Sequence, residues 1–255
     1  MAESAEAAVA ARLIACLDYT ELGNECTEGN VDRLLDGAMT PAGPVAAVCV
    51  WPRFVSQCRE RLEGTGVRIA TVVNFPDGKD QYEGALDEAR RAVRQGADEI
   101  DMVITRAKIP SDPDFVTAQV AAFVEAAGGQ VVKAILESGE MAGPDDVRIA
   151  ARAAIAGGAG FIKTSTGKTA HGASLEAARV MLEEIRASGK PVGLKPSGGV
   201  RTLADGKAYL DLADEIMGAG WATPQTFRIG ASGIMSDLLA HLGVGTGEPT
   251  ADGGY

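Results

Sequence analysis

Short apolar runs alternate with longer amphipathic stretches along the whole chain, and this alternation is the feature that most restricts its fold. The apolar runs occur at eight places: Leu13–Asp18, Val45–Trp51, Arg68–Asn74, Glu99–Ile104, Val131–Glu137, Phe161–Thr166, Pro191–Lys195 and Phe227–Gly230. Nearly continuous apolar runs are typical of strands buried on both faces of a parallel sheet. The stretches Lys79–Gln95 and Ser174–Ser188 carry apolar residues at helical spacing, which predicts helices between strands.

Eight strand–helix units in 255 residues give a repeat of about 32 residues, which suits an α/β chain folded as a (β/α)8 TIM barrel. The main alternative is an open doubly wound sheet, but no GxGxxG motif follows the first predicted strand. No linker rich in Pro, Gly or Ser divides the chain, so we expect one domain over residues 1–255. The tail 243–255 is rich in glycine and acidic residues, and we expect it to be flexible.

The charge balance and composition exclude several classes of protein. Asp and Glu number 35 against 24 Lys and Arg, a formal net charge of −11, whereas nucleic-acid binding needs a basic face. No apolar run approaches the about 20 residues of a membrane helix, and the acidic N-terminus lacks the basic region of a secretory signal. Four cysteines without CxxC spacing favour reduced thiols in a cytoplasmic protein. With only two histidines, we expect no metal site.

Two lysines stand on neighbouring predicted strands, close to the edge where barrel enzymes place their catalytic groups. Lys163 lies in the sixth run and Lys195 ends the seventh, and neighbouring strands are about 4.8 Å apart. Each ammonium group disfavours the charge on the other, and burial acts in the same direction, so a free amine at neutral pH is expected. A free amine is what Schiff-base formation with a carbonyl needs. The residues also leave open that these lysines form structural ion pairs with aspartates.

Carboxylates on other predicted strands are the candidate partners of these lysines. Asp101, on the fourth strand, is placed to pair with Lys195 and to move protons. Asp18, on the first, is a candidate for the same work, although a single strand-end carboxylate more often orders a loop. Lys133 and Glu137 share the fifth strand, and we expect them to balance each other, with a structural role for Glu137. Interleaved lysines would repel Mg²⁺, so no metal is expected there.

Glycine-rich segments follow the last three predicted strands. They are Thr166-Gly167-Lys168, Ser197-Gly198-Gly199-Val200-Arg201 and Gly230-Ala231-Ser232-Gly233. Glycine lets backbone N–H groups approach phosphate oxygens, and barrels often bind phosphate after strands seven and eight. Together the segments predict a phosphorylated substrate and a cationic mouth on an acidic protein. The expected cations of that mouth are Lys133, Lys163, Lys168, Lys195 and Arg201.

Two further residue types are given no chemistry by the sequence. Cys49 has no histidine placed to activate it, so we expect a buried apolar residue. His171 lies in a predicted loop, and we assign it no role.

The motifs, taken in order, resemble those of the deoxyribose-phosphate aldolase family of Schiff-base (class I) aldolases. The matching segments are Leu17–Thr20, Ala46–Val50, Ile69–Pro76, Gly96–Asp101, Val132–Lys133, Leu136–Glu140, Phe161–Lys168, Lys195–Arg201 and Arg228–Ser232. They span nearly the whole chain, and the lysine-bearing segments Phe161–Lys168 and Lys195–Arg201 are the most specific. The resemblance implies that Lys163 forms the Schiff base with acetaldehyde, that Lys195 lowers the pKa of Lys163 and assists proton transfer, and that Asp101 is the acid–base group working with a bound water.

The resemblance also implies residues that bind the substrate. Asp18, Cys49 and Thr166 match positions of the substrate pocket. The phosphate-binding set is matched by Gly167, Lys168, Gly198, Gly199, Arg201, Gly230 and Ser232. Tyr255 matches a C-terminal tyrosine that is thought to assist proton abstraction.

The chain departs from the family pattern at two positions. Gly233 stands where a second serine is frequent, which removes one hydroxyl from the phosphate site, and Ser197 stands where alanine is frequent.

From the resemblance we expect reversible cleavage of 2-deoxy-D-ribose 5-phosphate to D-glyceraldehyde 3-phosphate and acetaldehyde, in deoxyribonucleoside catabolism. No cofactor is expected, because the lysine amine supplies the chemistry. One alternative is another Schiff-base aldolase or transaldolase acting on a different sugar phosphate, and another is a non-catalytic sugar-phosphate-binding barrel. The expected partners are small molecules, with no nucleic acid and no membrane, and the resemblance also implies a homodimer.

Overall fold

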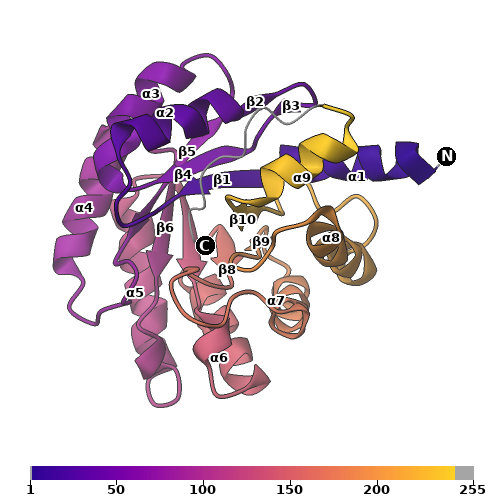
Figure 1. Ribbon diagram of the computed structural model, residues 1–255. Helices are drawn as coiled ribbons and strands as arrows, with labels where there is room; N and C mark the ends of the chain where they lie inside the picture. The colour runs from indigo at the N-terminus through magenta and orange to yellow at the C-terminus, as the bar shows by residue number, and fades with distance from the viewer. Residues whose placement is uncertain (1, 245–255) are drawn as a thin grey trace.

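Eight parallel strands form one sheet that curves into a barrel, with helices on its outside (Figure 1). The computed structural model describes residues 2–244. Its barrel strands are β1 (Leu17–Glu21), β4 (Ala47–Val50), β5 (Arg68–Val73), β6 (Glu99–Val103), β7 (Val131–Ile135), β8 (Phe161–Lys163), β9 (Gly193–Lys195) and β10 (Ile229–Ala231). They are ordered β10-β1-β4-β5-β6-β7-β8-β9, and parallel bridges Leu194–Phe227 and Ser197–Gly230 join the two ends. The predicted TIM barrel is therefore confirmed, and the open doubly wound sheet is wrong.

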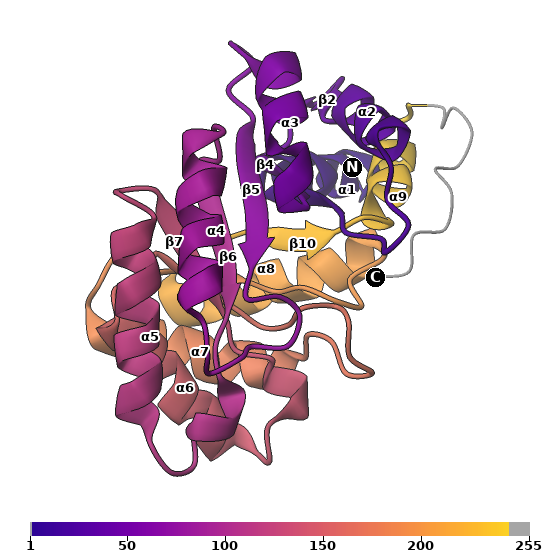
Figure 2. The same cartoon turned by 90° about the vertical axis from the view of Figure 1, so that its left-hand side faces the viewer.

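The helices form a ring around the sheet. They are α1 (Ala2–Ala15), α2 (Glu28–Gly37), α3 (Val55–Leu62), α4 (Glu83–Arg94), α5 (Pro113–Ala126), α6 (Pro144–Ala156), α7 (Leu175–Ser188), α8 (Leu203–Met217) and α9 (Ile234–His241). Helices α4 to α8 pack in chain order, and α1 packs against both α8 and α9 (Figures 1 and 2). A small antiparallel pair, β2 (Met39–Thr40) and β3 (Gly43–Pro44), lies outside the barrel sheet. No helix in residues 2–244 is long and apolar enough to cross a membrane.

Alternate side chains of each strand face two different environments, the apolar layer between sheet and helices and the barrel interior. On β6, Ile100 and Met102 belong to the large apolar core shared with the helices, whereas Asp101 between them does not. Successive side chains of a strand point to opposite faces, so Asp101 faces the barrel interior. On the β4 and β5 side, the interior holds a small apolar cluster that includes Ala47, Cys49 and Ala70. The interior is thus apolar on one side and charged on the other.

The first strand and one helix begin later than the sequence pattern predicts. Strand β1 starts at Leu17, because Leu13 and Ile14 are buried residues of α1, an alanine-rich segment with high helix propensity. Helix α4 starts at Glu83 instead of Lys79. The Lys79 carbonyl instead accepts hydrogen bonds from side chains of three other segments: Asn74, Thr105 and Gln119. Helix α7 lies where the sequence pattern predicts a helix, over Leu175–Ser188. Ser174 is its N-cap, because Ser174 Oγ accepts a hydrogen bond from Ala177 N at 3.1 Å.

Gly193 on β9 provides a test of the interior packing. A Cβ added there would collide with the Phe161 ring and lie 2.7 Å from the Thr226 carbonyl oxygen. We expect Gly193→Ala to lower the free energy of unfolding by about 1–3 kcal/mol, because the packed interior cannot accept the extra methyl group. Urea denaturation followed by circular dichroism measures this change. The control is Gly84→Ala on α4, where nothing lies within 4 Å of the new methyl and a gain of roughly 0.5 kcal/mol is expected. Equal stability of the two variants would contradict the packing argument.

Candidate active site

Seven charged side chains, from five strands and the residue before β10, meet inside the barrel. All are at most 3% exposed, a degree of burial that charged residues reach only when they are paired. We call them the interior charge cluster: Asp18, Glu99, Asp101, Lys133, Lys163, Lys195 and Arg228. Burying so much charge is costly unless each group is compensated, so the contacts within the cluster decide its properties.

The two lysines predicted from neighbouring strands meet at one carboxylate. Lys163 and Lys195 are register partners on β8 and β9. Oδ2 of Asp101 accepts a hydrogen bond from Nζ of Lys163 at 2.9 Å and from Nζ of Lys195 at 2.7 Å. The structure thus brings all three predicted catalytic residues together.

The charges around the two lysines separate their acidities. Burial lowers the pKa of Lys163 and Lys195 lowers it further, while Asp101 opposes both effects. Burial also disfavours the ammonium form of Lys195, but Asp101 and Asp18 outweigh it and hold the pKa of Lys195 well above its ordinary value. Lys163 therefore reaches the free amine more easily, while Lys195 keeps its proton. This difference suits a pair in which one lysine attacks and the other stays cationic.

Asp18 lies inside the barrel and orders no loop, which corrects the single-residue interpretation. Its carboxylate contacts Lys133 at 2.5 Å, Lys195 at 2.5 Å and Arg228 at 2.6 Å. Burial alone would raise the pKa of Asp18, but these three cations hold it well below its usual value. Asp18 is therefore an anion shared by three cations.

The expected balance between Lys133 and Glu137 is wrong. Lys133 is 0% exposed and contacts Asp18, Glu99 and Asp101, so it does not belong to the open mouth. Glu137 follows β7 with φ of 55°, and among the described residues no ion pair joins it to Lys133. Its carboxylate accepts hydrogen bonds from N and Oγ1 of Thr166, at 3.1 and 2.6 Å. The structural role predicted for Glu137 therefore fits its position, but its partner is the loop after β8.

The sequence reasoning missed Glu99 and Arg228. Arg228 donates to Asp18 Oδ1 at 2.6 Å and to both carboxylate oxygens of Glu99 at 2.8 and 3.1 Å. Strand alternation did indicate that these two side chains face the interior. Glu99 lies two residues before Asp101, and Arg228 lies two residues before Gly230, so each shares the strand face of that residue. A charged residue at the start of a strand is common at surfaces, however, so the pattern alone did not indicate burial.

The glycine-rich loops after β8 and β9 lie against each other. Gly167, Gly198 and Gly199 have φ of 74°, 81° and 85°, a region that favours glycine. Ala173 N donates to the carbonyl oxygens of Ser197 and Gly198, both at 3.0 Å. Three of the predicted phosphate-binding glycines thus lie in positive-φ turns of the two adjoining loops after β8 and β9.

The other predicted anion-binding residues surround these turns. Lys168 Nζ donates to the Leu22 carbonyl at 2.7 Å, and partial burial lowers the pKa of Lys168. Arg201 is exposed and directly precedes Thr202, the N-cap of α8. Ser232 is half-buried next to Gly233, the residue before α9. These positions add charge and a helix N-terminus to the same edge.

Gly230 and Ser197 lie beside Lys195. A Cβ at Gly230 would collide with Ser197 Oγ and lie 3.0 Å from Lys195 Cε, so the glycine makes room for the lysine side chain. Ser197 Oγ and Ser165 Oγ are buried without a hydrogen-bond partner in the described part of the chain. Both serines follow a cluster lysine by two residues, and an unpaired buried hydroxyl is unusual in a folded protein.

The remaining predicted residues have simpler surroundings. Cys49 is 0% exposed, as expected of a buried apolar cysteine. Thr166 is held by Glu137, and its hydroxyl also accepts from Lys168 N at 3.0 Å. His171 is exposed, with Nδ1 3.1 Å from Glu140 Oε1. Tyr255 lies outside the described residues.

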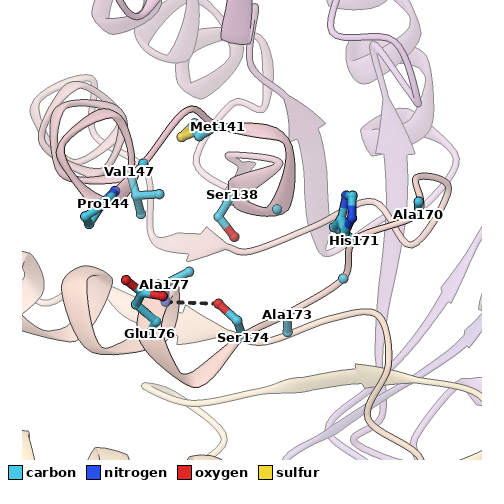
Figure 3. Close-up of a pocket in the computed structure, with 13 residues that line it drawn as sticks. Ser138, Met141, Pro144, Val147, Ala170, His171, Ala173, Ser174, Glu176 and Ala177 are labelled. Atoms are coloured by element: carbon cyan, nitrogen blue, oxygen red, sulfur yellow. Dashed lines mark hydrogen bonds between the residues drawn. The ribbon is translucent and has the colours of Figure 1, made fainter.

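A cavity of about 510 Å³ lies between the N-termini of α6 and α7, and the loop that carries His171 also lines it. Ser138, Met141, Val147, Ala173, Ser174 and Ala177 are among its lining residues (Figure 3). None of the seven cluster residues lines it. The cavity therefore flanks the lysine site instead of containing it.

Comparison with known proteins agrees with this arrangement of fold and lysines. A family model described as DeoC/LacD family aldolase matches residues 12–236. A curated deoxyribose-phosphate aldolase from Agrobacterium fabrum is 45% identical over 247 residues, covering 96% of this chain and 95% of the relative. The chain therefore belongs to the DeoC/LacD aldolase family, and the predicted resemblance is confirmed.

Solved structures show the same fold. A deoxyribose phosphate aldolase from Aeropyrum pernix, described as a unique tetrameric structure, matches with a TM-score of 0.74 at 25% identity, over 92% of this chain and 91% of that chain. A structure from Toxoplasma gondii matches with a TM-score of 0.85 at 22% identity, over 94% and 96%. The second likeness supports the fold alone.

The buried cysteines allow a test of how closed the barrel interior is. Burial raises the pKa of Cys49, and it raises those of Cys16 and Cys58 to about 11 and about 12. Iodoacetamide reacts with thiolates, so we expect no labelling of Cys49 in the folded protein at about pH 8. Peptide mass spectrometry of native and urea-unfolded samples measures the labelling, with the unfolded sample as the positive control. Labelling of native Cys49 alone would show that the thiol is open to the pocket.

Proposed function

We propose that this aldolase cleaves 2-deoxy-D-ribose 5-phosphate reversibly to D-glyceraldehyde 3-phosphate and acetaldehyde through a Schiff base on Lys163, as a step of deoxyribonucleoside catabolism. The observation that carries the proposal is the shared oxygen of Asp101, which holds Lys163 and Lys195 at 2.9 and 2.7 Å. Burial favours the neutral amine of Lys163, which is the nucleophilic form. The 45% identity to a relative named deoxyribose-phosphate aldolase supports this substrate.

The proposed reaction begins at the aldehyde carbon of the open-chain sugar. The Lys163 amine adds to C1, and loss of water, with protons moved by Asp101 and Lys195, leaves an iminium ion. The proton of the C3 hydroxyl is then removed, the C2–C3 bond breaks and its electron pair flows to the iminium nitrogen. Glyceraldehyde 3-phosphate leaves, and the remaining enamine is protonated at C2. Hydrolysis of the new iminium releases acetaldehyde and restores Lys163.

Asp101 and Lys195 are the groups placed to move these protons. Asp101 contacts the Lys163 nitrogen directly, and Lys195 stays cationic under the influence of two carboxylates. In this proposal Lys195 donates a proton and Asp101 transfers protons, with a bound water between these two residues and the substrate. Tyr255 is proposed to assist proton abstraction at C2, which a Tyr255→Phe variant tests by a lower rate of C2 hydrogen exchange in acetaldehyde.

The phosphate of the substrate is proposed to bind at the three glycine-rich loops. The turns at Gly167, Gly198 and Gly199 support this placement, because their positive φ values suit close approach of an anion to the backbone. The proposed set is completed by Lys168, Arg201, Gly230 and Ser232. Asp18, Cys49 and Thr166 are proposed to border the sugar, with Asp18 acting through the lysines that it contacts.

Assembly and location are proposed from the same family relation. We propose a homodimer, and light scattering after size-exclusion chromatography tests it against a monomer or the tetramer of the Aeropyrum pernix relative. A cytoplasmic location is supported by four buried free cysteines, which suit a reducing compartment. Fractionation of cells that produce the protein tests that location.

Reductive trapping tests the Schiff base. We expect sodium borohydride with acetaldehyde to leave a two-carbon adduct on Lys163, because hydride fixes the iminium that the amine forms. Peptide mass spectrometry locates the adduct, and Lys163→Arg should abolish both the adduct and substrate turnover. The matched control Lys190→Arg, at an exposed lysine, should change neither. An adduct found only on other lysines would contradict the proposed mechanism. Trapping of ketone donors in place of acetaldehyde would instead favour a Schiff-base aldolase with a different substrate.

Gly233 allows a test of the phosphate site. It has φ of −77°, and nothing lies within 4 Å of an added Cβ, so serine fits there without strain. One more hydroxyl at the N-terminus of α9 should strengthen phosphate binding by about 0.5–1.5 kcal/mol, which lowers KM for 2-deoxyribose 5-phosphate by roughly 2- to 10-fold. Steady-state kinetics measures this, with unphosphorylated 2-deoxyribose as the control substrate whose KM should not change. A parallel fall in both KM values would place the effect away from the phosphate.

A further inference from the structure

The interior charge cluster contains one more cation than carboxylate. Its ion pairs are 2.5 to 3.3 Å long and connect four cations to three carboxylates. The cations are Lys133, Lys163, Lys195 and Arg228, and the carboxylates are Asp18, Glu99 and Asp101. With every group charged, the cluster therefore carries one unbalanced positive charge in a buried setting, where water screens it poorly.

The carboxylate contacts are shared unevenly among the four cations. Lys133 contacts all three carboxylates, and Lys195 and Arg228 contact two each. Lys163 contacts only Asp101 among the described residues, through the oxygen that Lys195 also binds. Lys163 is thus the cation whose proton the cluster stabilises least.

Arg228 pairs with the two carboxylates that Lys163 does not contact. Its guanidinium donates to Oδ1 of Asp18 and holds Glu99 with two hydrogen bonds. Arginine cannot lose its proton in this setting, so its charge is permanent. Any adjustment of the cluster's total charge must therefore come from a lysine or a carboxylate.

We propose that Arg228 is a positioning residue that keeps Lys163 in its free-amine form by supplying the surplus positive charge of the interior cluster. This inference rests on the proposed Schiff-base function of Lys163. The surplus is relieved when one lysine loses its proton, and the least-paired lysine does so at the smallest cost. Glu99 acts in the opposite sense, because its negative charge favours the ammonium form.

Other charged or ionisable groups near the cluster do not cancel the surplus. Cys49 on β4 is neutral, because burial raises its pKa. Glu137 is buried but bound by Thr166, and it has no ion pair with a cluster cation. Arg68 reaches Glu99 at 3.7 Å from a half-exposed position, where it adds positive charge. The surplus therefore remains after its neighbours are counted.

The pH dependence of trapping at Lys163 tests this role. The rate of the two-carbon adduct is measured with acetaldehyde and sodium cyanoborohydride from about pH 5 to about pH 9. Arg228→Met removes a positive charge and favours the ammonium form, so the rise of the profile should move to higher pH by about one unit. At a fixed pH below the rise, this shift is a roughly tenfold lower rate. Glu99→Gln should move the rise to lower pH.

Three further variants separate charge from structure. Arg228→Met combined with Glu99→Gln restores one surplus positive charge, so its profile should return close to that of the wild type. Arg228→Lys keeps the charge while losing the guanidinium geometry, and it should also leave the rise near the wild-type pH. Arg179→Met removes a surface arginine that pairs with Glu215 and should move nothing.

The outcomes distinguish this inference from the proposed function. If Arg228→Met and Arg228→Lys shift the profile equally, or neither Arg228→Met nor Glu99→Gln shifts it, the charge role is overturned while Lys163 remains the Schiff-base lysine. If Arg228→Met does not fold, two other results test the charge role: the shift of the Glu99→Gln profile to lower pH, and the return of the double variant to the wild-type profile. Absence of any Lys163 adduct in the wild-type protein would instead overturn the proposed function and this inference with it.

Discussion

Mutual compensation of charges inside the barrel is the constraint on which the rest of this structure depends. Seven ionisable side chains occupy a space that most barrels fill with apolar residues. Removing one partner from a buried ion pair typically costs about 3–5 kcal/mol, because the other charge is left uncompensated. Five strands and the residue before β10 contribute to this cluster, so the ion pairs also join segments far apart in the sequence, such as those of Asp18 and Arg228. The same ion pairs therefore stabilise the fold and set the protonation of the candidate catalytic lysines.

The unequal distribution of these contacts makes one lysine different from the others. Lys133 is surrounded by carboxylates and stays charged, while Lys163 shares a single carboxylate oxygen with Lys195. Around this centre the loops after β8, β9 and β10 present glycine turns, a half-buried lysine and an exposed arginine. The proposed Schiff-base reaction on a phosphorylated substrate needs two features, a reactive amine inside the barrel and an anion-binding edge, and these residues are the candidates for both. The acidic total charge of the chain does not oppose this, because the local field at the rim is set by nearby groups.

Much of the fold and part of the site were predictable from local patterns. All eight predicted strands overlap the observed ones, because continuous apolar runs report burial on both faces. The first strand was predicted too early, since Leu13 and Ile14 are as apolar in a helix as in a strand. Lys133 was given the wrong partner, the loop-ordering role favoured for Asp18 was wrong, and Glu99 and Arg228 were missed. Strand alternation indicates which side chains face the barrel interior, but it carries no information about which of them meet across the barrel.

The sequence by itself determined that a βα repeat would bury lysines and carboxylates on one face of its strands, because alternation assigns every second residue to the interior. It also placed glycine turns after the last three strands, where backbone N–H groups become available. Only the tertiary structure decided which carboxylate each cation contacts. Closing the sheet brings β1, β6, β7, β8, β9 and β10 around one centre. The protonation of Lys163 depends on those cross-barrel distances, since the interaction between charges depends on their separation and on their burial.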